Sequence, residues 1–90
     1  MINKLIINKS NMKKFKLVFG YVTKGGEMIK LDETIFEASS KKSAINMQPA
    51  MFDLYRAIKK SKANTLFCNL YKYEINVVVL PFIKTLYYNW

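Results

Sequence analysis

The chain has 90 residues, 51% of them hydrophobic and 14% aromatic, and its 15 basic and six acidic residues give a formal net charge of +9. This length suits one domain with one modest core, and the apolar content is too high for a disordered tail. One cysteine, Cys68, and no histidine exclude an internal disulfide and the usual zinc sites, and they favour a reducing cytoplasm. No apolar run reaches the roughly 18 residues of a membrane span, and no secretory signal is recognisable.

Fourteen of the 15 basic residues are lysine, and Arg56 is the remaining one. Lysine lacks the bidentate fork of arginine, so it favours non-specific attraction to phosphate or to acidic protein surfaces. Sequence-specific DNA recognition is therefore disfavoured. The same bias, with abundant Asn, Ile, Tyr and Phe, is also typical of an A/T-rich genome, which would add lysines for reasons unrelated to binding.

The N-terminal segment contains a short apolar run at residues 5–7 and a second methionine, Met12. We predict a strand-like arm over residues 1–12. Two alternatives stay open, an arm exchanged between copies and a disordered extension ahead of a start at Met12, because termini become ordered only when they are tied down. Residues 13–90 are predicted to form a single domain.

The clearest strand pattern covers residues 13–24, where apolar side chains alternate with other residues. A Gly-Gly reversal at 25–26 leads into a second segment, so we predict an antiparallel hairpin over about residues 14–37. The predicted apolar faces are Phe15, Leu17, Phe19 and Tyr21 on the first strand and Ile29, Leu31 and Ile35 on the second.

The register of this hairpin depends on its turn. A simple two-residue turn sets Phe19 opposite Asp32, whereas a one-residue slip sets Tyr21 opposite Leu31. Because the buried face decides the register, we predict the slipped pairing, with a glycine bulge at the turn.

From residue 39 to residue 60 the apolar residues recur at helical spacing. Ser39 or Ser40 can act as the N-cap, and the lysines that follow the stretch suit the negative end of the helix dipole. Lys41 and Lys42 fall in the first turn, where a positive charge is unfavourable by about 0.3–1 kcal/mol. This placement favours an anionic partner, the alternative being that lysine is the default surface residue here.

Pro49 lies inside the helical stretch and removes one hydrogen bond. Either the helix kinks near residues 45–47, or a second helix begins with Pro49 as its first residue, which we prefer. The buried contacts are predicted to join Met51, Leu54, Tyr55 and Ile58 to Leu17, Phe19 and Ile35. On this basis Leu54→Ala would cost roughly 2–4 kcal/mol through cavity formation.

Beyond the helix we predict one or two strands over residues 65–82. Residues 65–75 alternate, with Leu66, Cys68 and Leu70 on one face. The apolar run at residues 77–80 is typical of a strand buried on both sides or at an interface, until Pro81 removes a ladder donor. The aromatic-rich residues 83–90 either dock on the sheet, which we prefer, or contact another molecule.

Together these elements predict an α+β domain in the order ββαβ(β). Its antiparallel sheet has three to four strands and packs on one helical segment interrupted at Pro49. This order alone is shared by too many small domains to indicate a function.

The sequence offers little for catalysis. Cys68 has no histidine to activate it and falls within a predicted strand, so a buried inert thiol is the better interpretation. Asp32 and Glu33 are neighbours in a strand and point to opposite faces. We therefore predict no catalytic residue, no metal site and no cofactor, and we expect that the protein is not an enzyme.

Two binding functions remain. In the first, Phe67, Tyr71 and Tyr73 stack on nucleic-acid bases while Lys72 holds phosphates, without sequence specificity. Against it, no RNP-type motif is present and the element order does not match that platform.

The second, preferred hypothesis is a small protein that binds and inhibits or modulates a host protein or ribonucleoprotein complex. Short, lysine-rich chains with surplus aromatic residues and no catalytic set are typical of phage and mobile-element products, including anti-CRISPR proteins. The expected location is the host cytoplasm, and no membrane partner is expected. A homodimer stays open as an alternative, because the apolar content exceeds what one small core requires. The candidate binding residues are Lys13, Lys14, Lys16, Lys41, Lys42, Tyr71, Lys72, Tyr73, Tyr87, Tyr88 and Trp90.

Five of these lysines lie at the starts of predicted elements: Lys13, Lys14 and Lys16 begin the first strand, and Lys41 and Lys42 begin the helix. If the first strand and the helix begin at the same edge of the fold, their charges form a single field. An anionic partner would then bind less tightly as salt rises, whereas an interface anchored by aromatic residues would depend on salt much less.

Overall fold

The computed structural model describes residues 12–58 and 65–89. In chain order the elements are β1 (Lys13–Val22), β2 (Met28–Ala38), α2 (Lys41–Ile58), β3 (Thr65–Lys72) and β4 (Phe82–Asn89). All neighbouring strands pair antiparallel, and the sheet order is β2-β1-β3-β4. The predicted α+β class and ββαβ(β) order are confirmed, whereas most of the predicted arm over residues 1–12 lies outside the described residues.

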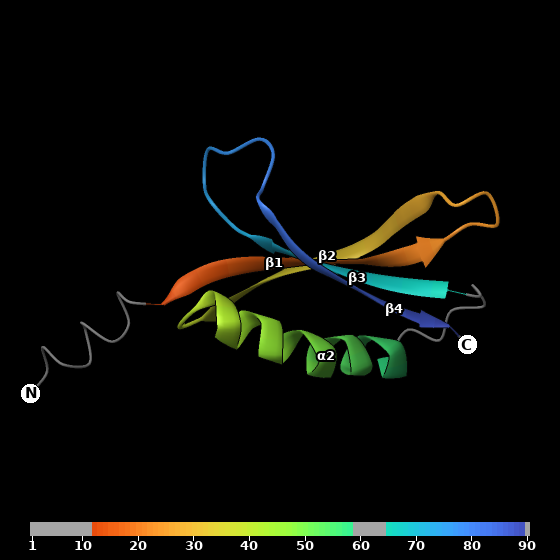
Figure 1. The fold of residues 1–90 in the computed structure, drawn as a ribbon, viewed down its shortest axis with the longest axis horizontal. Coiled ribbons are helices and arrows are strands. Elements are labelled where there is room, and N and C mark those ends of the chain that lie inside the picture. Colours follow the sequence, from red (N-terminus) through yellow and green to blue (C-terminus); the bar gives the residue numbers. More distant parts are fainter. Residues whose placement is uncertain (1–11, 59–64, 90) are drawn as a thin grey trace, which may run out of the picture.

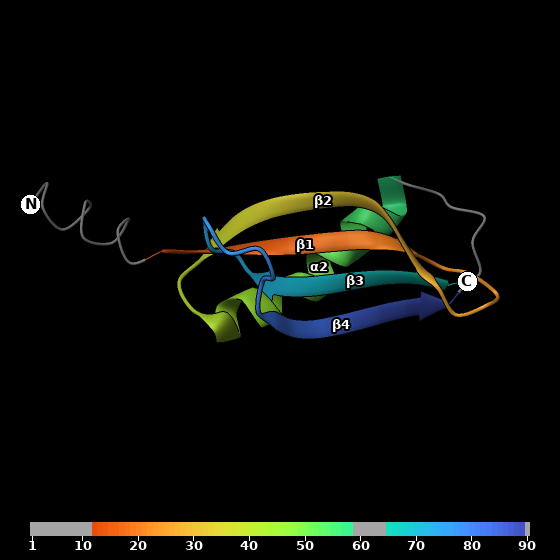
Figure 2. The ribbon, with the colours of Figure 1, turned by 90° about the horizontal axis from the view of Figure 1, so that it is seen from above.

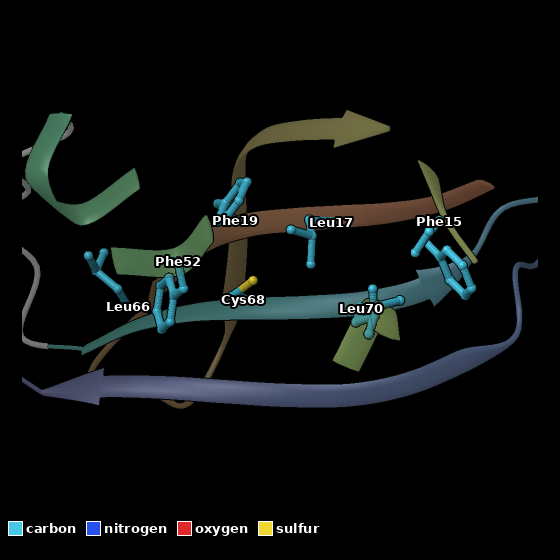
Figure 3. Close-up of a cluster of buried hydrophobic side chains, with 9 residues drawn as sticks. Phe15, Leu17, Phe19, Phe52, Leu66, Cys68 and Leu70 are labelled. Carbon is cyan, nitrogen blue, oxygen red and sulfur yellow. The ribbon is translucent and has the colours of Figure 1, made fainter. Parts of the chain in front are cut away.

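Helix α2 covers one face of the sheet, here called the inner face, and the opposite face is the outer face (Figures 1 and 2). The predicted alternation of β1 is confirmed, because Phe15, Leu17 and Phe19 are buried and face the helix. Figure 3 shows them beside the inner residues of β3. The buried apolar cluster consists of Phe15, Leu17, Phe19, Ala38, Ala44, Phe52, Leu66, Cys68 and Leu70.

The hairpin register differs from the prediction. The turn has a glycine irregularity, as predicted, because Thr23 pairs with Glu27 around three residues and Gly26 has a φ of 87°. A second irregularity falls between Phe19 and Gly20, and beyond it Phe19 lies opposite Asp32 instead of in the predicted slipped register. Leu31 is the extra residue of this bulge, which is why Tyr21 lies opposite Ile29. The slipped pairing would have buried Leu31 and Ile35, but both are exposed in a strand at the edge of the sheet.

At Gly20 the backbone of β1 lies very close to its neighbours. A Cβ atom built there would lie 2.0 Å from the carbonyl oxygen of Ile29 and 2.6 Å from the ring of Phe67. Only a residue without a side chain allows this approach. The ring of Phe67 therefore lies against bare backbone and is buried on the outer face of the sheet.

Helix α2 begins at a serine cap, as predicted. The Ser43 N–H donates to Oγ of Ser40 at 3.1 Å, which satisfies one of the free donors of the first turn. The preference for a second helix starting at Pro49 is wrong, because α2 is one helix with Pro49 inside it. Pro49 is on the exposed side, where water can solvate the carbonyl group that proline leaves without a partner.

The buried side of α2 is formed by Ala44, Gln48 and Phe52. The predicted side is wrong in part, because Leu54 is 62% exposed and Ile58 is also exposed. The cost predicted for Leu54→Ala therefore does not apply, since truncating an exposed residue leaves no cavity. Five of the seven predicted residues line, with Thr34, a shallow apolar hollow of about 250 Å³ instead: Phe19, Met51, Leu54, Tyr55 and Ile58.

Gln48 is fully buried and links the helix to two strands. Its Nε2 group donates to the carbonyl oxygen of Cys68 at 2.9 Å and to that of Lys84 at 3.2 Å. Its Oε1 atom has no partner among the described residues. A polar residue takes the centre of the helix–sheet contact because these carbonyl groups compensate its burial.

Tyr55 joins the same helix to β2 through Asp32. Its ring stacks on Phe19 with centroids 4.2 Å apart, and its hydroxyl donates to Oδ2 of Asp32 at 2.9 Å. Burial, followed by the contact with the Asp32 carboxylate, raises the pKa of Tyr55 to about 12. This bond fixes the position of Asp32 on the inner face.

The predicted strand at residues 77–80 is wrong. These residues belong to the connection between β3 and β4, and the final strand begins only at Phe82. Asn76 reverses the chain with a φ of 70°, a conformation that Asn tolerates better than most residues. The preferred docking of residues 83–90 on the sheet is confirmed for residues 83–89, which belong to β4 and lie beside β3.

Candidate functional site

One end of the molecule gathers lysines from three elements. The start of β1, the start of α2 and the β3–β4 connection all lie at this end, as Figures 1 and 2 show. The expected meeting of strand and helix starts is thus observed for Lys13 and Lys41, and Lys72 joins them from the end of β3. Together with four other residues they line a pocket of about 280 Å³, here called the lysine pocket: Lys13, Phe15, Lys41, Lys72, Pro81, Phe82 and Ile83.

The other candidate lysines at this end lie outside the pocket. Lys14 and Lys16 belong to the outer face, and the ammonium group of Lys16 pairs with Glu33 at 2.7 Å. Lys42 is exposed in the first turn of α2. The predicted lysines therefore share one end of the fold but are divided between its two faces.

The β3–β4 connection, residues 73–81, is here called the valine loop, and it rises from the outer face of the sheet (Figure 1). Two backbone hydrogen bonds of 3.0 Å fix its base. The Lys72 N–H donates to the carbonyl oxygen of Pro81, and the Tyr73 N–H donates to the carbonyl oxygen of Lys14. Val78 is 99% exposed and Val79 is 82% exposed. Ile75 and Val77 are exposed as well, so the loop holds four apolar side chains in solvent on an anchored base, with Val78 and Val79 the most exposed.

A hollow of about 280 Å³ separates the valine loop from the outer face of the sheet. Its walls are mostly apolar, apart from the lysine side chain that contributes to its rim. The sequence located this apolar run but not its exposure. The residues around the hollow are Lys16, Val18, Tyr71, Val78, Val79 and Leu80.

The candidate aromatic residues do not form one surface. Tyr71 is half-buried and packs edge to face on Phe82, with ring centroids 5.7 Å apart. Tyr73 is half-buried at the base of the valine loop, and Tyr87 is exposed on the outer face. Tyr88 packs toward the core on the inner face. Trp90 lies outside the described residues.

The predicted base-stacking surface is not assembled. Phe67 is only 2% exposed, because it is pressed against Gly20, and it therefore presents no ring face to a base. Lys72 lies opposite Phe15 and lines the lysine pocket, whereas Tyr71 points to the outer face. The residues expected to stack on bases and to bind phosphate are thus separated by the sheet.

The single arginine has a structural role that the sequence did not reveal. The guanidinium carbon of Arg56 lies 3.7 Å from the ring centroid of Tyr88 and 5.7 Å from that of Phe52. Arg56 also pairs with Asp53 in the same helix. A planar cation suits such stacking better than lysine does. The guanidinium group of Arg56 is therefore occupied by contacts within the fold.

Cys68 is buried on the inner face of β3 and contacts Gln48, with 3.8 Å from Nε2 to Sγ. Burial raises the pKa of the Cys68 thiol to about 12, although the hydrogen bond from Gln48 lowers it. Since the thiolate is the reactive form, this residue is a poor nucleophile near neutral pH. Within the described part of the chain, no group of three or more His, Cys, Asp or Glu residues is placed to hold a metal ion.

Cys68 should resist alkylation in the native protein. At pH 8 iodoacetamide should modify it at least about a hundredfold more slowly than in roughly 6 M guanidinium chloride, because the folded state both buries and protonates the thiol. Mass spectrometry of timed samples measures the two rates. Comparable rates would show that β3 opens readily or that the thiol lies at the surface.

Comparison of the chain with protein-family models, with curated proteins and with solved structures gave no match. Among residues 12–58 and 65–89, no helix is long and apolar enough to cross a membrane. The surface of the fold is therefore the available indication of function.

Proposed function

We propose that this chain is a non-enzymatic binding module that inserts the valine loop into an apolar cleft of a partner protein and thereby inhibits or modulates it. The observation that carries the proposal is the exposure of Val78 and Val79 at 99% and 82%. Burying one valine side chain contributes roughly 1.5–3 kcal/mol, and the free fold forgoes nearly all of this for both residues. A partner protein can supply that burial.

The loop is built to present these side chains. Backbone hydrogen bonds fix its base at Lys72 and Tyr73, and Asn76 makes the reversal ahead of the valines. A loop that is already held in place loses less conformational freedom when it binds. Its position on the outer face, away from α2, leaves it accessible (Figure 1).

The charge around the loop indicates the kind of partner. Six lysines and three acidic residues of the described segments gather at this end of the domain, which leaves an excess of positive charge. An acidic rim around the partner's cleft would speed the encounter and fix its orientation. The lysines are Lys13, Lys14, Lys16, Lys41, Lys42 and Lys72, and the acidic residues are Glu33, Glu37 and Glu74.

The class of partner we propose is a host protein complex that handles nucleic acid, the target expected of a small inhibitor. Direct nucleic-acid binding ranks second, because Phe67 is buried and Arg56 is engaged within the fold. It would depend on lysines alone, and such binding is weak at physiological salt.

The double variant Val78→Asp/Val79→Asp should reduce capture of the partner at least about tenfold, because two carboxylates cannot enter an apolar cleft. Tagged wild-type and variant proteins are compared in pull-downs from host lysate, with and without nuclease. Stability should change by less than about 0.5 kcal/mol, since both side chains are exposed in the free fold.

The matched control is Leu54→Asp/Ile58→Asp, which adds the same charge at exposed apolar residues of α2. It should capture the partner as the wild type does. If the control loses the partner while the valine variant keeps it, the interface is the hollow beside α2. If nuclease removes every partner, the second-ranked function is correct.

A further inference from the structure

The lysine pocket is separate from the outer hollow beneath the valine loop. Lys13, Phe15 and Lys72 belong to the inner face of the sheet, and Lys41 comes from the first turn of α2. The valine hollow instead lies against the outer residues Val18 and Tyr71. A ligand in the lysine pocket would therefore not need Val78 and Val79, although Pro81, the last residue of the valine loop, belongs to the pocket wall.

The lysine pocket has an excess of positive charge in the free fold. Three lysines line it, its lining among the described residues includes no acidic residue, and the first turn of α2 contains none either. Lys72 pairs with Glu74 at 3.4 Å, but in an exposed position. The positive end of the helix dipole is at Lys41, so the dipole adds to the repulsion instead of relieving it. An anion at this point would satisfy all these groups together.

The remaining wall of the pocket is apolar. Phe15 is buried at its base, and Pro81, Phe82 and Ile83 close one side. The volume of about 280 Å³ lies just below the usual range for ligand pockets, roughly 300–1,000 Å³, so it suits a fragment rather than a large cofactor. Charged rim and apolar wall together select a ligand that is itself anionic at one end and apolar at the other.

We propose that the lysine pocket binds an anionic group carried on an aromatic or aliphatic stem, such as an aryl phosphate or carboxylate. This goes beyond the protein-binding function proposed above and does not depend on it. A sugar-phosphate polymer fits less well, because its ribose rings are polar and the pocket closes on Pro81 and Phe82.

The test uses the full chain labelled with ¹⁵N, titrated with phenyl phosphate and separately with inorganic phosphate at constant ionic strength. Amide shifts at Lys13, Phe15, Lys41 and Lys72 should saturate together. Phenyl phosphate should bind at least about fivefold more tightly than inorganic phosphate, since only the former fills the apolar wall. Both ligands should bind more weakly as salt rises.

The variant Lys13→Gln/Lys41→Gln should raise the Kd for phenyl phosphate at least about tenfold, because two of the three cations of the pocket are removed. Its matched control, Lys24→Gln/Lys42→Gln, removes the same charge from exposed positions that do not line the pocket, and its Kd should stay within about twofold of wild type. Retained dispersion of the amide spectrum shows that each variant is folded.

Three outcomes would overturn the proposal: non-saturable shifts spread over all lysines, equal affinity for the two phosphates, or an equal effect of the two variants. An oligothymidylate of about eight nucleotides that displaces phenyl phosphate at lower concentration would assign the pocket to nucleic acid instead. The Val78→Asp/Val79→Asp variant should bind phenyl phosphate normally, so failure of the pocket and failure of the valine loop give different results.

Discussion

Gln48→Glu is expected to destabilise the fold by about 3–5 kcal/mol at pH 7, enough to unfold much of a small domain. The amide nitrogen of Gln48 faces the carbonyl oxygens of Cys68 and Lys84, and the residue is fully buried. A carboxylate there would lose both donated hydrogen bonds and place a negative charge beside two acceptors.

The loss should depend on pH in a defined direction. Burial would raise the pKa of the introduced carboxyl group in the folded variant above its unfolded value of about 4.3. Below the unfolded value both states are protonated, and the variant is closest to wild type. As pH rises from the unfolded toward the raised folded value, the stability difference grows, and above the folded value it levels off. Urea unfolding followed by circular dichroism, from pH 4 to pH 7, measures this difference.

Gln48→Met separates the effect of charge from that of shape. Methionine has a similar length, removes the unpaired Oε1 atom and should cost no more than about 1.5 kcal/mol, independently of pH. If Gln48→Glu is as stable as Gln48→Met at pH 7, then water reaches this position and α2 does not exclude solvent from the inner face.

Gly20→Ala is expected to destabilise the fold by at least about 3 kcal/mol. The new Cβ would lie 2.0 Å from the carbonyl oxygen of Ile29, which belongs to the backbone of the paired strand. It would also lie 2.6 Å from the ring of Phe67. This clash can be relieved only if the backbones of β1 and β2 move apart, because a change in one side chain does not move a carbonyl group. Thermal and urea unfolding measure the loss.

Two further variants test the cause. Gly25→Ala should change stability by less than about 0.5 kcal/mol, since the atom nearest to its Cβ would be the Thr23 hydroxyl oxygen at 3.8 Å. Gly20→Ala/Phe67→Ala should be less stable than Gly20→Ala, because the carbonyl clash remains and a cavity is added. A double variant more stable than the single one would show that the ring, not the carbonyl group, limits the site.

The strands and the helix could be predicted because their periodicity is local. The alternation of Phe15, Leu17 and Phe19 indicated one buried face, and Ser40 marked the start of the helix. The buried side of the helix could not be predicted as reliably. Gln48 is polar and interrupts the apolar pattern, yet carbonyl groups 20 and 36 residues away compensate its burial.

The C-terminal region shows a second limit of the sequence. Residues 77–80 have a high β-strand propensity. They nevertheless lie outside the sheet, because the chain reverses at Asn76 and the Lys72–Pro81 hydrogen bond closes the loop that contains them. Periodicity identifies apolar residues without saying which of them a fold of this size has room to bury.

The candidate site was predictable in part for a similar reason. Lysines at the starts of a strand and a helix indicated a shared basic end, because element starts can meet in a small antiparallel fold. The apolar wall of the lysine pocket depends on Pro81, Phe82 and Ile83, and their position follows from where β4 begins. That boundary is set by pairing with β3, which no local pattern encodes.

The two edges of the sheet differ in how well they resist growth by an added strand. β2 carries Lys30, Asp32, Glu33 and Glu37 along its 11 residues, whereas Lys84 is the one charged residue in the eight of β4. Charges on an edge strand oppose pairing with another chain, because an incoming strand would have to desolvate them. Among the described residues, charge therefore protects the β2 edge better than the β4 edge, so we expect aggregation in concentrated solution to begin by strand pairing at β4.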